Sequence, residues 1–129
     1  MTPAETVRGI YDRWREGDFR TADERFDPLF LLVMRPEFPE SGTYLGLERL
    51  AEYMRGFLEP WSRITIEAEE LIEAGDSIVA AVCQRGAGTS SGAVTEFRYF
   101  QVWTFRGPVA IRLETVRERE DALALVGLT

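Results

Sequence analysis

The sequence predicts an α+β domain in which helices pack into the hollow of a curved antiparallel sheet around an apolar pocket. Up to Trp61 most apolar residues recur at helical spacing, and after Trp61 they alternate with polar residues, as in strands. Turns that contain glycine then separate four strand-like segments, which is typical of a sheet built from hairpins. A chain of 129 residues is expected to form one domain, residues 1–129.

Two helices are expected at the start of the chain. Residues 2–5 combine a capping Thr, a Pro at the first helical position and a Glu that completes a capping box. The apolar residues that follow form a single stripe that ends before Gly17. Asp18 can then cap a second, shorter helix with Phe19, Ala22 and Phe26, which Pro28 ends.

A strand, a loop and the clearest helix complete the first half. Residues 29–35 are apolar on both faces, which predicts a buried strand. Residues 36–42 contain two prolines and a glycine and predict a loop. After Gly46 one face collects Leu47, Leu50, Met54 and further apolar residues up to Trp61, the strongest helical pattern in the chain.

The second half is expected to be mostly strand. The expected elements are a strand beginning at 64–69, a turn at 74–76, a strand at 77–84, a glycine-rich hairpin loop at 86–92, strands at 95–105 and 109–117, and a short helix at 120–126.

The last two strands assign faces to their side chains. Odd positions from Phe97 to Phe105 and from Val109 to Arg117 are expected to face the helices. The opposite face still presents Phe100 and Val102, more apolar surface than water favours. We therefore expect a homodimer formed through this outer sheet face.

Composition excludes several classes of function. A net charge of −7 would repel nucleic acid and anionic lipid, so neither is an expected partner. The sequence has no histidine and one cysteine, which argues against a zinc site, and no cofactor is expected. Because no apolar run is long enough to span a bilayer and no signal peptide is visible, the expected location is cytoplasmic.

Inward polar and aromatic side chains are the candidates for a ligand site. A small hydrophobic or aromatic molecule with one or two polar anchors would suit the set Tyr11, Trp14, Tyr53, Tyr99, Gln101, Trp103, Thr115 and Arg117. The aromatic residues could instead be plain core, and Arg117 could form a surface ion pair. Gln101 either bonds a ligand oxygen or is satisfied by a polar neighbour.

Short segments spread over nearly the whole chain resemble a known family. They are YDRWREGD at 11–18, GTYLG at 42–46, EAGD at 73–76, VWTFR at 102–106 and DAL at 121–123. Together they resemble the SnoaL-like polyketide cyclase group of the nuclear transport factor 2-like superfamily. The resemblance implies a cone-shaped, curved antiparallel or mixed sheet with helices packed in its concave face, an internal pocket and commonly a dimer.

The catalytic residues of that superfamily do not transfer to this chain. The strand Asp of ketosteroid isomerases would fall at Gln101, and their helix Tyr would fall near Ile10, one position from Tyr11. The SnoaL-like cyclases use a His, which this chain lacks, and Tyr99 and Gln101 stand where limonene-epoxide hydrolases have acidic residues. We therefore expect a small-molecule-binding protein of unassigned reaction. The alternatives are a cofactor-independent isomerase, cyclase or hydrolase whose acid or base is an inward tyrosine or a carboxylate, and a dimeric interaction module with a filled cavity.

Overall fold

A computed structural model describes residues 2–20 and 24–128. In chain order its elements are α1 (Pro3–Arg15), β1 (Phe26–Met34), β2 (Gly42–Leu45), α2 (Leu47–Leu58), β3 (Trp61–Ala74), β4 (Ser77–Gly88), β5 (Val94–Arg106), β6 (Val109–Val116) and α3 (Arg119–Leu125). The strands form one sheet in the order β2-β1-β6-β5-β4-β3. The β1–β6 pair is parallel and the other pairs are antiparallel, so the sheet is mixed.

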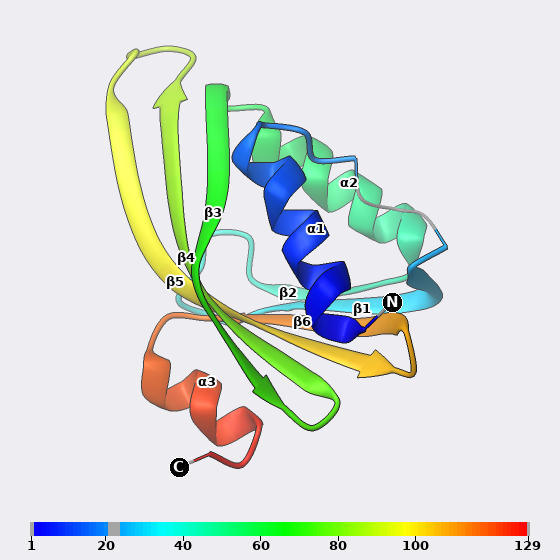
Figure 1. Cartoon of the computed structure of the whole chain (residues 1–129). Coiled ribbons are helices and arrows are strands. Elements are labelled where there is room, and N and C mark those ends of the chain that lie inside the picture. The colour runs from blue at the N-terminus through cyan, green and yellow to red at the C-terminus, as the bar shows by residue number, and fades with distance from the viewer. Residues whose placement is uncertain (1, 21–23, 129) are drawn as a thin grey trace.

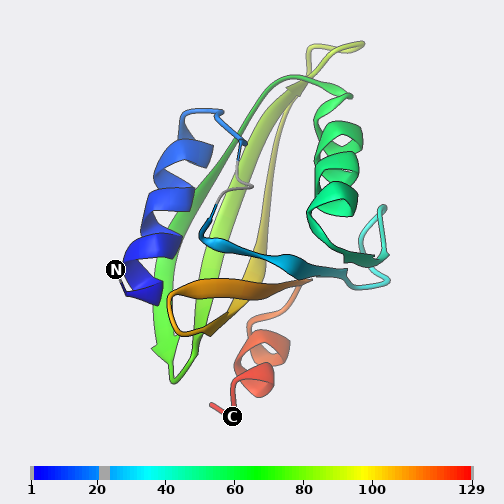
Figure 2. The ribbon, with the colours of Figure 1, turned by 90° about the vertical axis from the view of Figure 1, so that its right-hand side faces the viewer.

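The sheet is strongly curved, and the helices divide between its two faces. The long strands β3, β4 and β5 arch over α1 and α2, which lie in the hollow, whereas α3 lies on the opposite side (Figure 1). Figure 2 shows α1 and α2 on either side of the hollow, with β1 crossing below it. The expected α+β class and helix-filled curved sheet are confirmed. Among the described helices none is long and apolar enough to cross a membrane.

Helix α1 forms for the reasons its sequence suggests. The Thr2 hydroxyl accepts a bond from the Glu5 amide (3.1 Å), and the Thr2 amide donates to the Glu5 carboxylate (2.9 Å). This capping box satisfies backbone groups that a helix start leaves open. The buried stripe includes Ile10, Tyr11 and Trp14, so the helix directs two candidate site residues into the hollow.

The chain departs from expectation after α1. Residues 18–20 are not helical, and Phe26 begins β1 instead of ending a short helix, while Ala22 lies outside the described residues. Phe26 pairs with Ala110 of β6, and its ring lies 5.0 Å from that of Phe30. Long-range pairing thus overrides the local helical pattern. The expected loop at 36–42 is largely present. Strand β2, which pairs with β1 from Gly42 onward, was not predicted from the sequence.

A β-bulge in β6 changes which of its side chains face the helices. Thr104 pairs with Arg112 and Phe105 with Ala110, so Ile111 is an extra residue. The small Ala110 therefore joins the core, and the expected inward facing of the start of this strand is wrong. Beyond the bulge the odd-numbered residues face the helices, as expected.

The outer face of the sheet also differs from the expectation, because helix α3 packs on it. Val102 is buried within the chain in a cluster with Val79, Val116 and Ala122, the last of which lies on α3. Phe100 packs against the same cluster. The expectation that Val102 lies open to a partner subunit is wrong, because α3 covers it. Formation of a homodimer stays a prediction, and Val102 cannot be its contact.

Candidate functional site

A cavity of about 410 Å³ lies between α1, α2 and the concave face of the sheet. Its volume is within the range of roughly 300–1,000 Å³ typical of small-molecule sites. Aromatic rings from α1, β1, α2, β3 and β5 form much of its wall, among them Trp14, Phe26, Phe30, Tyr53, Phe57 and Trp103. The interior is therefore mostly apolar.

Most of the predicted site residues lie at this cavity. Those that line it are Trp14, Tyr53, Tyr99, Gln101, Trp103 and Thr115. Tyr11 does not line it and instead lies behind Gln101, to which it is hydrogen-bonded. Arg117 is exposed beyond the end of β6, with its guanidinium 5.7 Å from the centre of the Phe97 ring. The expectation that Arg117 lines the pocket is therefore wrong.

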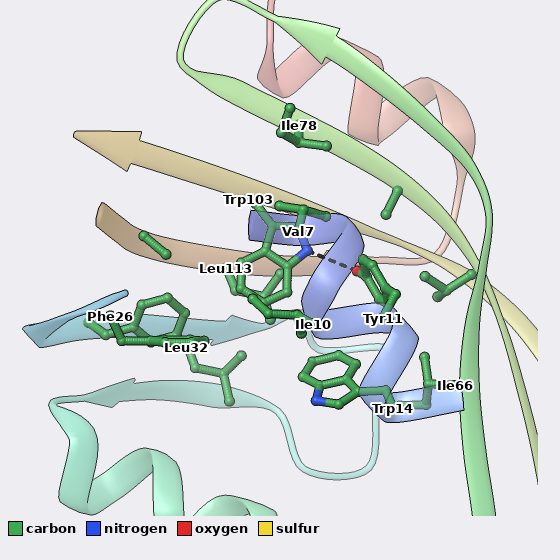
Figure 3. Packing of buried hydrophobic residues seen from close by; sticks show 14 of the residues in the cluster. Val7, Ile10, Tyr11, Trp14, Phe26, Leu32, Ile66, Ile78, Trp103 and Leu113 are labelled. Carbon is green, nitrogen blue, oxygen red and sulfur yellow. Dashed lines mark hydrogen bonds between the residues drawn. The ribbon is translucent and has the colours of Figure 1, made fainter. Parts of the chain in front are cut away.

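A chain of hydrogen bonds fixes the amide of Gln101. The indole N–H of Trp103 donates to the Tyr11 hydroxyl oxygen (2.8 Å), and the Tyr11 hydroxyl donates to Gln101 Oε1 (2.6 Å). The first of these bonds is the dashed line in Figure 3. Because an indole can only donate, the Tyr11 proton is directed to the amide oxygen. The amide nitrogen of Gln101 is left without a partner in the described part of the chain.

A second tyrosine–glutamine pair joins β5 to the neighbouring strand β4. The Tyr99 hydroxyl donates to Gln84 Oε1 (2.8 Å), and both residues line the cavity. Burial raises the pKa of Tyr11 and of Tyr99 well above that of a free phenol. Burial is also the largest cause of the raised pKa of Tyr53, whose hydroxyl has no bond within the described residues. All three phenols are therefore neutral at physiological pH.

Two further buried polar atoms at the cavity wall lack partners. Within the described residues neither Trp14 Nε1 nor Thr115 Oγ1 has a hydrogen-bond partner. Figure 3 shows the indole nitrogen of Trp14 pointing away from both Tyr11 and Ile66. Buried polar groups in native proteins are nearly always bonded, so unpartnered ones at a cavity are candidate ligand contacts.

Charged groups are almost absent from the described lining of the cavity. Glu40 is the one charged residue among the described residues that line it, and it is exposed in the 36–41 loop. The Tyr44 hydroxyl donates a hydrogen bond to the backbone carbonyl oxygen of Glu40 (2.8 Å). Other carboxylates pair outside the cavity, such as Glu114 with Arg35 at 2.8 Å. No cluster of three or more possible metal ligands occurs in residues 2–20 and 24–128.

The sequence interpretation missed Gln84 and Glu40. Gln84 follows Ile78, Ala80 and Val82 at even positions of β4, and these three are core residues. That alternation could have identified Gln84 as inward. Glu40 could not have been found in this way, because no periodic pattern specifies where a loop residue lies.

The architecture is that of nuclear transport factor 2-like proteins. An NTF2-like protein from Burkholderia thailandensis has 21% identity and a TM-score of 0.79, with 99% of this chain and 97% of that chain covered. IdmH, a putative polyketide cyclase from Streptomyces antibioticus, has 17% identity and a TM-score of 0.74, with 98% and 99% covered. TerC, co-crystallised with polyporic acid, has 20% identity and a TM-score of 0.75, with 96% and 97% covered.

A comparison of the sequence with family models identifies the family within that fold. The model of the SnoaL-like domain matches residues 7–111, and the chain belongs to this family. No curated protein matches the sequence.

Proposed function

We propose that this protein binds a small hydrophobic or aromatic molecule in the cavity between α1, α2 and the sheet. The observation that supports this most directly is the cavity of about 410 Å³ with its aromatic walls and, among its described lining residues, one charged residue, Glu40. Removing apolar ligand surface from water favours binding by about 25 cal/mol per Å². The few polar atoms inside would fix the orientation of the ligand.

The chemistry of the wall favours binding over proton transfer. The glutamine amides do not titrate, and the buried tyrosines have raised pKa values, so none of these groups is a base near neutral pH. An interaction module with a filled cavity is disfavoured by the open volume of about 410 Å³. Among the structural neighbours, TerC was crystallised with a small molecule, polyporic acid.

The three tryptophans of the chain, Trp14, Trp61 and Trp103, all line the cavity, so their fluorescence should report its occupancy. We expect fluorene, a rigid aromatic probe, to quench this emission saturably with one site per chain. Leu113→Phe, which enlarges a cavity-lining residue, should weaken fluorene binding at least tenfold. Ile111→Phe on the same strand lies outside the lining and is the matched control. Equal affinity in the two variants, or no saturable binding of any aromatic probe, would contradict the proposal.

A second candidate function is proton transfer by Glu40. Its carboxylate forms no hydrogen bond or ion pair with the described residues, and its charge contributes to the raised pKa of Tyr53. If the protein is an isomerase or cyclase, Glu40→Gln should abolish turnover of a bound substrate while leaving its dissociation constant within about threefold. Retained turnover in that variant would exclude Glu40 as the base.

A further inference from the structure

We propose that the mouth of the cavity, at Gly56 of α2, is an exit through which a chain substituent of the bound ligand reaches solvent. This inference deepens the proposed function and rests on it, because it names the class of compound that the cavity accepts. That class is an aromatic compound with an extended chain, whose rings lie inside the cavity while the chain passes across Gly56. Residue 56 then determines which chains fit.

The exposed residues of the cavity lining mark where the cavity meets solvent. Inner lining residues such as Phe30 and Trp103 are fully buried. The lining residues in the described part of the chain that are exposed come from the 36–41 loop, the end of α2 with the turn after it, and the start of β5. They are Pro39, Glu40, Gly56, Pro60 and Thr95. The mouth therefore lies between these three segments.

The β4–β5 hairpin fixes one edge of this mouth. The backbone amide of Thr89, near the hairpin tip, donates to the carbonyl oxygen of Pro60 (2.9 Å). Figure 2 shows the end of α2 below this tip. Because a backbone bond holds this edge in place, the opening beside it does not depend on a side chain that could turn aside.

Gly56 occupies a position at which the fold does not require glycine. It lies inside α2, where glycine is less favourable than alanine because its backbone loses more freedom. Its φ is not in the left-handed region, and a Cβ built on it would meet no described atom within 4 Å. Neither the backbone conformation nor close packing thus explains the glycine. What the missing side chain provides is space.

Helical spacing places that space at the cavity. Residues three positions apart lie on the same side of a helix, and Tyr53 precedes Gly56 by three positions. Tyr53 lines the cavity, and so does Gly56 itself. A side chain at position 56 would therefore extend beside the Tyr53 ring and narrow the mouth.

The polar groups at the mouth suit an uncharged chain. The Tyr53 hydroxyl, which has no hydrogen bond within the described residues, can donate to an oxygen of the chain. The charge of Glu40 contributes to the raised pKa of Tyr53, so this carboxylate acts on the same opening. An anionic chain would be repelled there, whereas a neutral ether or alcohol chain would not.

The experiment compares fluorene with fluorene that carries a neutral tri(ethylene glycol) chain. The chain is attached at the end of the long axis in one compound and at the bridging carbon in another, and the tighter binder of the two is used. The measured quantity is the ratio of its association constant to that of fluorene, from tryptophan fluorescence and calorimetry. In the wild type we expect a ratio within about threefold of one, because the chain stays in water when the rings are bound.

Gly56→Phe fills the mouth and should lower this ratio about tenfold or more, since an added side chain that clashes costs about 1–3 kcal/mol. Ala51→Phe is the matched control. It adds the same side chain at an exposed position of α2 outside the described lining of the cavity, and it should leave the ratio unchanged. Gly56→Ala should raise the melting temperature, because alanine favours a helix and its Cβ has room, and should lower the ratio less than Gly56→Phe does.

The outcomes separate this proposal from the proposed function. A wild-type ratio below about one tenth would mean that the mouth admits no chain, and would overturn the exit. Equal ratios in Gly56→Phe and Ala51→Phe would also overturn it, while leaving binding of aromatic compounds intact. A lower melting temperature of Gly56→Ala would mean that folding requires the glycine, with the same consequence. If neither compound binds the wild type, the proposed function itself fails.

Discussion

The Tyr11 hydroxyl should be costly to remove, because it joins α1 to the sheet through two bonds. In Tyr11→Phe the Trp103 indole N–H, on a side chain that is 0% exposed, loses its acceptor. The Gln101 oxygen loses its donor but can turn toward the cavity that it lines. An unsatisfied buried donor costs about 1–3 kcal/mol, so we expect a loss of about 2 kcal/mol in the free energy of unfolding.

Urea unfolding followed by tryptophan fluorescence would measure this loss. Tyr99→Phe is the matched control, because it removes one buried bond, to Gln84, and leaves no indole without an acceptor. It should cost about 1 kcal/mol or less. Since Tyr11 and Gln101 share a bond, the double variant Tyr11→Phe/Gln101→Leu should lose less stability than the sum of the single variants. A Tyr11→Phe protein within about 0.5 kcal/mol of the wild type would refute the reasoning.

Two further predictions concern packing. Gly86→Ala would place a Cβ 2.6 Å from the Trp61 ring, so we expect it to displace Trp61 from the cavity wall, with a shift in emission maximum and a loss of about 1–3 kcal/mol in stability. Gly88→Ala, whose Cβ would meet its nearest atom at 3.4 Å, is the control for urea unfolding. Val102→Arg should cost about 3 kcal/mol or more by burying an unpaired charge under α3. Val94→Arg, at a position 74% exposed, should change stability by less than about 0.5 kcal/mol, and equal effects would contradict the burial argument.

Local physics explains the parts of the fold that could be predicted. The capping box and apolar stripe of α1 lie within one short segment, and so does the amphipathic pattern of α2. Strict alternation along β5 correctly indicated that Gln101 and Trp103 face the helices. The cavity residues of these elements were therefore accessible to sequence reasoning.

Features that depend on distant partners could not be predicted in this way. Phe26 joins β1 because of its pairing with Ala110, far along the chain. The bulge at Ile111 is invisible in an alternating pattern, yet it decides which residues of β6 face inward. Val102 has the pattern of an uncovered apolar residue until α3 packs over it.

Gln101 shows why an isolated residue can support two interpretations at once. Its oxygen is satisfied by Tyr11, 90 positions earlier in the sequence, as a structural glutamine would be. Its NH₂ group has no partner in the described part of the chain, as a ligand contact would require. Sequence alone presented these as alternatives, whereas the two ends of one amide can serve both roles.

The same hydrogen-bond chain limits the chemistry that the cavity can perform. Tyr11 accepts from Trp103 and donates to Gln101, so its proton is committed to an amide oxygen that cannot be its base. Burial raises the pKa of Tyr11 and of Tyr99, which makes both weaker acids than free phenol while leaving them good donors. A wall of neutral donors can bind and polarise a carbonyl group, but abstraction of a proton needs a base. Among the described lining residues Glu40 is the one carboxylate, and it lies on the exposed 36–41 loop. Proton abstraction by a described lining residue would therefore take place near that loop, whereas the uncharged inner wall would hold and orient the ligand.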